Sequence, residues 1–156
     1  MDRRKNGCKR HLIGDADGLP LIIVTPPANV RDEVPLVAML DDLPPVRMPS
    51  GQSRYRPGAA VGDRAYGFPW IIKQVVERRI ASLLAPRGSP HGSGLGRVRY
   101  VIERTMSWMT GFRRIEMCFE RSGAHWQAFN ELACCVICAN RLRAVNSAQR
   151  QKRMAA

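Results

Sequence analysis

Two acidic residues stand at positions where they could hold a metal ion. Asp63 ends a short apolar run, and Glu103 follows 40 residues later in a segment patterned like a helix. Two carboxylates that lie close together bind a divalent cation because the cation relieves their mutual repulsion. Paired Mg²⁺ or Mn²⁺ ions can activate a water or a 3′-hydroxyl and stabilise the leaving oxygen of a phosphodiester. Asp63 and Glu103 are therefore candidate catalytic and metal-binding residues.

Each of the two acids also has a plainer interpretation. Asp63 by itself is typical of a turn or helix cap. Glu103 by itself is typical of an exposed partner in a weak ion pair with Arg99, one helical turn earlier. If the pair is catalytic, Arg99 could keep the Glu103 carboxylate ionised and also contact a DNA phosphate.

The charge of the chain favours a polyanionic partner. Its 25 Lys and Arg residues outnumber 13 Asp and Glu residues, which gives a net charge of +12, and nucleic acid is the commonest partner of such a protein. An acidic membrane surface and a merely basic protein are the alternatives. No run of 18 apolar residues occurs, so we predict no membrane span. The candidate DNA-binding residues are Lys9, Arg10, Arg99, Arg104, Arg113 and Arg114.

Five cysteines, an odd number, indicate reduced thiols in the cytoplasm. Cys135 and Cys138 form a CxxC pair, but no second ligand pair stands at a spacing suited to zinc. We expect these thiols to be buried as small apolar side chains. The three histidines share no spacing with a serine or cysteine nucleophile, which excludes a triad from serious consideration.

The surrounding pattern predicts the elements that must position the two acids. A hairpin is expected over 11–15 and 21–25, and Asn29 with Asp32 resembles the cap of a following helix. Prolines and glycines favour a loop over 46–58. The remaining predictions are helices over 34–43, 68–79, 98–112 and 125–143, and strands over 59–63 and 80–84. Strands that alternate with helices indicate an α/β fold, with Asp63 at the strand end where such sheets bind ligands.

Several of these segments resemble bacterial insertion-sequence DDE transposases. The run Gly62 to Gly67, with sequence GDRAYG, resembles the D-[KR]-[GA]-Y motif of that family. The run Arg99 to Trp108 resembles its R-x-x-x-E signature, which Phe112, Arg113 and Arg114 continue. Residues 9–13 and 27–32 match the family's blocks around the hairpin, so the likeness covers about residues 6–143.

The resemblance implies a ribonuclease H-like fold, a mixed sheet with flanking helices. It implies that the parent enzyme cleaves and joins DNA at insertion-sequence ends with Mg²⁺ or Mn²⁺. Asp63 is similar to the second catalytic aspartate, Glu103 to the catalytic glutamate and Arg99 to the signature arginine. The family often has a basic residue seven positions after the glutamate; Thr110 stands there, which puts that DNA contact in doubt, although Arg113 is close.

The front of the chain departs from the family. The first aspartate belongs to a strand well before Arg10, which only nine residues precede. We therefore expect an incomplete sheet without its first central strand, divided into a basic disordered start (1–9), a partial catalytic domain (10–143) and a polar basic tail (144–156). Unpaired strand edges predict low stability and no activity for the chain alone. An upstream reading frame could supply the missing segment by frameshifting.

The sequence also leads to expectations about cellular location, oligomeric state and alternative functions. The resemblance implies a protein of the bacterial cytoplasm, associated with the nucleoid and not with a membrane, whose complete form is a homo-oligomer. An inactive DNA-binding remnant that represses transposition is the first alternative. A degenerate unfolded product and a small RNA-binding protein are the others, the last without an RRM or KH signature.

Overall fold

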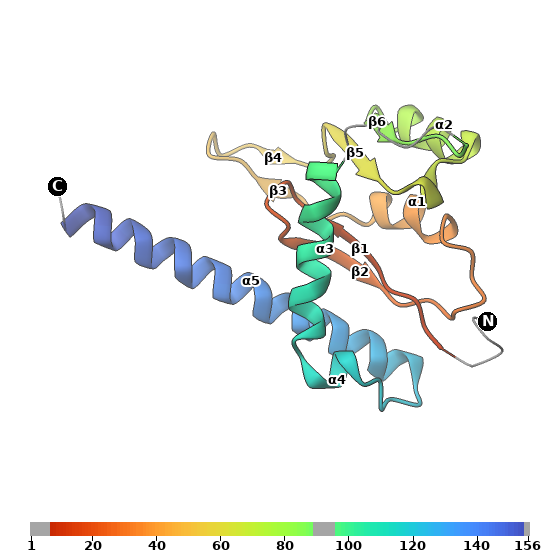
Figure 1. The fold of residues 1–156 in the computed structure, drawn as a ribbon. Helices are drawn as coiled ribbons and strands as arrows, with labels where there is room; N and C mark the ends of the chain where they lie inside the picture. The colour runs from red at the N-terminus through yellow and green to blue at the C-terminus, as the bar shows by residue number, and fades with distance from the viewer. Residues whose placement is uncertain (1–6, 89–95, 155–156) are drawn as a thin grey trace.

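The computed structural model describes residues 7–88 and 96–154, which form small sheets and helices (Figure 1). Strand β1 (His11–Gly14) pairs antiparallel with β2 (Pro20–Val24). Strand β5 (Ala59–Gly62) pairs parallel with β6 (Ala81–Leu84). The predicted hairpin and both later strands are confirmed, as is the α/β class. No helix in these ranges is long and apolar enough to cross a membrane.

The hairpin extends further toward the N-terminus than expected. The Lys9 amide donates to the Pro26 carbonyl at 2.9 Å, and the Ala28 amide donates to the Gly7 carbonyl at 2.8 Å. The prediction of a disordered start is therefore wrong for residues 7–9, because they continue the pairing of the two strands. Residues 1–6 of that predicted segment lie outside the described residues.

Helices α1 (Val34–Asp41) and α2 (Pro69–Glu77) enclose the core beside the parallel strands. Each begins with a proline in its first turn, a position where the missing amide proton costs nothing. Glu33 precedes α1 without a side-chain cap, so the predicted cap at Asn29 is wrong. The protein has two separate hydrophobic cores. The core beside the parallel strands, called the second core, has the buried side chains Leu40, Ile71, Val75, Ile80 and Leu84.

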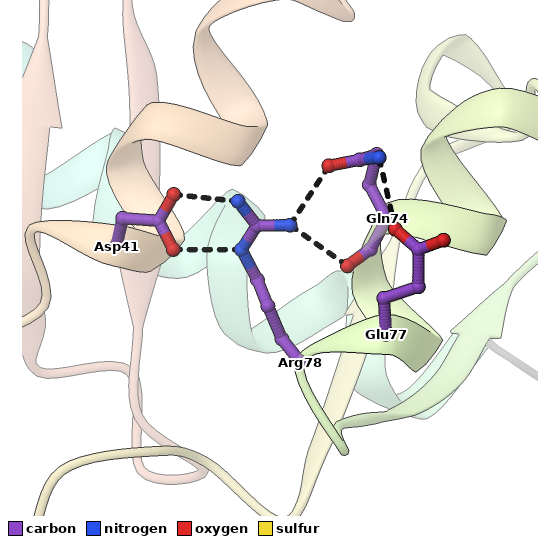
Figure 2. A network of polar contacts seen from close by, with 4 residues as sticks. All are labelled: Asp41, Gln74, Glu77 and Arg78. Atoms are coloured by element: carbon purple, nitrogen blue, oxygen red, sulfur yellow. Dashed lines mark hydrogen bonds and ion pairs between the residues drawn. The ribbon is translucent and has the colours of Figure 1, made fainter.

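An arginine ties the C-terminal ends of these two helices together (Figure 2). Arg78 donates from Nε and Nη2 to the two carboxylate oxygens of Asp41, at 2.7 and 2.6 Å. Its Nη1 donates to the backbone and side-chain oxygens of Gln74 at 2.9 and 3.0 Å. The hydrogen bonds from Arg78 hold the pKa of Asp41 below its usual value.

The segment between α1 and β5 is not the featureless loop that its composition predicts. Strand β3 (Val46–Arg47) pairs antiparallel with β4 (Ser53–Arg54). Gly51 takes a φ of 82° at the tip, a conformation that glycine adopts without strain. All four strand residues are exposed, so no apolar alternation marks this short hairpin in the sequence.

Three helices complete the described chain: α3 (Gly96–Thr110), α4 (Arg113–Glu116) and α5 (Gly123–Met154). Helix α5 lies along β2, where Gln127 Nε2 donates to the Ile23 carbonyl at 2.7 Å. The other hydrophobic core, called the first core, is formed by β2 and these three helices. Its buried side chains are Ile23, Met109, Ile115, Trp126, Ala133 and Ile137.

Helix α5 is longer than predicted. It continues through the polar residues after Arg143 and ends at Met154, so the expected end at 143 is wrong. Every residue from 139 to 154 is exposed, and Figure 1 shows this half of the helix extending away from the rest of the chain.

The described strands form three separate two-stranded sheets and no single mixed sheet. Strands β1 and β5 each keep one unpaired edge within the described residues. A hydrogen bond connects the antiparallel sheet of β1 and β2 with the parallel sheet of β5 and β6. It joins His11 Nδ1, on β1, to the hydroxyl of Tyr66, after β5, at 2.7 Å. β1 and β5 are not paired with each other.

Candidate carboxylates and basic surface

Asp63 follows β5 directly and begins a single 3-10 turn, Arg64–Tyr66. Its Oδ1 accepts a hydrogen bond from the Arg64 amide at 2.6 Å, and the side chain is exposed. Strand β5 fixes the backbone position of Asp63, and the Arg64 amide orients its Oδ1. Asp63 is exposed, so its carboxylate is accessible from solvent.

Gly67 closes the turn that carries Asp63. A Cβ at this position would lie 1.9 Å from the Ala85 carbonyl oxygen, which no side chain permits. The Gly67 carbonyl accepts a hydrogen bond from the Arg87 amide at 3.2 Å. The glycine is therefore needed for close packing of this turn against the end of β6.

Tyr66 and His11 form a partly buried polar contact that the sequence pattern did not predict. His11 is 5% exposed, and burial lowers its pKa. Burial, with smaller effects from the carboxylates of Asp32 and Asp63, raises the pKa of Tyr66 to about 12. Both shifts favour the neutral forms of the two side chains. The presence of Tyr66 in the GDRAYG run was the available signal.

Glu103 lies exposed on α3, and the next two residues fix that helix to the hairpin turn. Thr105, fully buried, donates from Oγ1 to the Gly18 carbonyl at 2.5 Å. Arg104 Nη2 donates to the Asp17 carbonyl at 2.6 Å. Gly18 has a φ of 78°, and a Cβ there would lie 2.7 Å from Thr105 Oγ1. The turn thus needs glycine both for its backbone and for contact with α3.

Arg104 is engaged within the protein as well as being a DNA-binding candidate. Its guanidinium carbon lies 4.9 Å from the centre of the Trp108 ring and 5.8 Å from that of Tyr100. Such contacts between a cation and an aromatic face are attractive. Together with the bond to Asp17, they give Arg104 a structural role that its spacing did not reveal.

The other basic candidates differ in how accessible they are. Arg114 donates to Glu120 at 2.6 Å and lies 4.3 Å from the Phe129 ring centre. Lys9 donates to the Val30 carbonyl at 2.9 Å and forms an ion pair with Asp32 at 2.8 Å. These contacts hold both side chains against the protein, so their predicted contact with DNA stays a prediction.

Three candidate DNA-binding residues remain: Arg10, Arg99 and Arg113. Arg10 is half-buried, burial lowers its pKa, and its Nη1 is buried without a hydrogen-bond partner among the described residues. Arg113 is exposed at the start of α4. Arg99 lies in the first turn of α3, and its side chain falls outside the described part.

The donor chemistry of Asp63 and Glu103 suits a hard cation, because Mg²⁺ prefers carboxylate oxygens. Within residues 7–88 and 96–154, no group of three or more His, Cys, Asp or Glu side chains is placed to share a metal ion.

The cysteines of α5 are only partly buried. Cys134 packs against the first core, and burial raises its pKa to about 11. Cys138 is half-buried and Cys135 is exposed. The expectation that the CxxC thiols are buried is therefore wrong for Cys135.

Residues 2–138 match the family described as "Transposase DDE domain". Over 142 residues the chain is 40% identical to a Burkholderia cepacia protein named "Putative transposase for insertion sequence element IS402", covering 91% of this chain and 67% of that protein. No solved structure matches the chain.

Proposed function

Because this chain belongs to the family of transposase DDE domains, we propose that it forms part of the catalytic domain of an insertion-sequence transposase, with Asp63 and Glu103 as two of its catalytic carboxylates. The parent enzyme cleaves DNA at the ends of its element and joins them to a target. The observation that carries the assignment is the placement of Asp63 after β5, with its motif residues holding the turn.

In this proposal Asp63 and Glu103 would hold Mg²⁺ or Mn²⁺, a metal that would supply activation of an attacking oxygen and stabilisation of a leaving oxygen. The amide of Arg64 orients Asp63 through its Oδ1. The partly buried hydrogen bond between His11 and Tyr66 fixes the turn after β5 against β1. Thr105 fixes α3, so that Glu103 is presented from a helix that cannot rotate freely.

We propose that a further strand lies between β1 and β5 and completes a ribonuclease H-like sheet. Unpaired strand edges attract additional strands. In the described residues β1 pairs only with β2 and β5 pairs only with β6, so each has one free edge that could receive such a strand. The strand would carry the third carboxylate, and a segment encoded by an upstream frame is the candidate source.

DNA is the proposed substrate, both as the terminal inverted repeats and as the target. This proposal places two side chains on the phosphates: Arg99, four residues before Glu103 in the sequence, and the exposed Arg113. Synapsis of two ends implies a homo-oligomer of the complete enzyme. The proposed location is the bacterial cytoplasm, at the nucleoid.

An inactive DNA-binding remnant that represses transposition is the second candidate. The observation that favours it is the presence of only two candidate carboxylates, with no third ligand beside them in the described chain. Such a protein would bind DNA with a strong dependence on salt and would not cleave it.

The two candidates separate in a nicking assay on duplexes that end in the inverted repeat. The chain is tested alone and with its upstream segment, in the presence of Mg²⁺, Mn²⁺ or a chelator. The catalytic proposal predicts metal-dependent nicks with the upstream segment. It also predicts their loss in Asp63→Asn and Glu103→Gln, while Glu116→Gln, a change at an exposed acid of α4, keeps activity. Binding without nicking in every mixture identifies the remnant.

A further inference from the structure

The exposed half of α5, residues 139–154, is strongly basic. It contains the cations Arg141, Arg143, Arg150, Lys152 and Arg153 and no carboxylate, since the last acid of the chain is Glu131. Nothing in the described protein covers this half, because each of its residues is exposed. A helix of 16 residues is about 24 Å long, which is long enough to follow a groove of duplex DNA.

The cations form two stripes on opposite sides of the helix. At about 100° per residue, Lys152 lies about 20° from Arg141. Arg143 and Arg150 lie about 180–200° from Arg141, on the other side. The helix therefore presents positive charge in two opposite directions, which matches a groove with a phosphate backbone on either side.

A different set of side chains lies between the two stripes. Asn146, Gln149 and Arg153 lie at about 140°, 80° and 120° from Arg141 on the same scale. With Arg150 they line one shallow hollow along the helix surface. Asn and Gln form paired hydrogen bonds with adenine, and Arg forms them with guanine, at base edges in the major groove.

We propose that residues 139–154 of α5 form an arm that lies in the major groove of duplex DNA, with Asn146, Gln149 and Arg153 toward the bases and the two cationic stripes on the phosphates. The major groove is about 12 Å wide and admits a helix. This surface is distinct from the candidate carboxylates. It rests on the proposed function only in taking DNA as the polyanion.

Two other occupants fit the arm less well. A membrane-surface helix needs an apolar face separate from its cations, but Leu142 and Val145 lie at about 100° and 40° from Arg141, on the side of Gln149 and Lys152. A second copy of the arm would bring like charges together along the whole contact, which is unfavourable.

The first test measures the affinity of the full chain for duplex DNA over a range of salt concentrations, with a chelator present so that no cleavage occurs. The stripe variant carries Arg141→Gln, Arg143→Gln, Arg150→Gln and Lys152→Gln. Its matched control removes the same charge from other exposed sites: Arg47→Gln, Arg54→Gln, Lys73→Gln and Arg121→Gln. Glutamine keeps a helix propensity close to that of arginine, and circular dichroism checks that helix content is unchanged.

We expect the slope of log K against log salt to fall by about 3–4 in the stripe variant, since each phosphate contact contributes about 0.9. The control should keep most of the slope. Equal losses in the two variants would overturn the arm and leave only a general effect of charge. Because no metal is used, failure of the catalytic proposal would not affect this result.

The second test addresses the groove. Bound wild-type protein should protect guanine N7, which faces the major groove, from methylation. The variant Asn146→Ala, Gln149→Ala and Arg153→Ala should lose that protection while its salt slope falls by only about 1. Unchanged protection in this variant, or sedimentation that shows the arm pairing with a second copy instead of DNA, would refute the proposed orientation.

Discussion

Replacement of Thr105 by valine tests how α3 is fixed in place. Thr105 is fully buried, and its Oγ1 donates to the Gly18 carbonyl at 2.5 Å. Valine keeps the shape of the side chain and removes only the donor, so the buried carbonyl of Gly18 loses that partner. An acceptor left in this state costs about 1–3 kcal/mol, and no cavity contributes because the volume is nearly unchanged.

The assay is thermal and urea unfolding followed by circular dichroism. For a protein of this size, each kcal/mol lowers Tm by about 2–4 °C. Thr110→Val is the matched control, because Thr110 is exposed on the same helix and donates to the Ser107 carbonyl at 2.9 Å. We expect the control to remain within about 0.5 kcal/mol of the wild type. Equal effects of the two changes would refute the assignment of Thr105 as the residue that fixes α3.

Three further predictions follow from the turn after β5 and from the ion pair. Gly67→Ala should destabilise the protein by about 3 kcal/mol or more, since backbone must move to admit the Cβ; Gly58→Ala, where nothing lies within 4 Å, should be neutral or slightly stabilising, and urea midpoints compare them. Tyr66 has a pKa raised from 10.0 to about 12, so its stabilising effect is complete below pH 10 and is lost as the pH rises through 12; Tyr66→Phe should lack this alkaline loss in unfolding scans. Asp41 has a lowered pKa, so its contribution is complete above its usual value of 3.8 and disappears as the pH falls through its folded value; Asp41→Asn should flatten the acid side of the stability profile, and it refutes the role of Arg78 if that profile is unchanged.

Periodicity predicted most of the elements because their apolar faces are actually buried. The hairpin and the helix that carries Glu103 contribute apolar side chains to the core, and these elements and the strands around Asp63 appear within a few residues of their expected bounds. The GDRAYG run also identified the turn that presents Asp63. These are local features, and local sequence is sufficient to specify them.

The features that sequence reasoning missed depend on contacts between distant segments or on propensity alone. The roles of Arg104 and His11 follow from partners 87 and 55 residues away, which no local pattern reveals. Beyond Arg143, α5 has no buried face to give a periodic signal. Its alanines, glutamines and arginines are strong helix formers, and that was the signal available for the longer helix.

The contact between β2 and α5 has a consequence during synthesis. Gln127, which hydrogen-bonds to the Ile23 carbonyl, is separated from it by 104 residues. At about 5–20 residues per second on the ribosome, the apolar face of the hairpin emerges roughly 5–20 s before the helix that covers it. The nascent chain therefore exposes Ile23 and its neighbours during translation, so the speed of elongation and access to chaperones will affect the yield of folded protein.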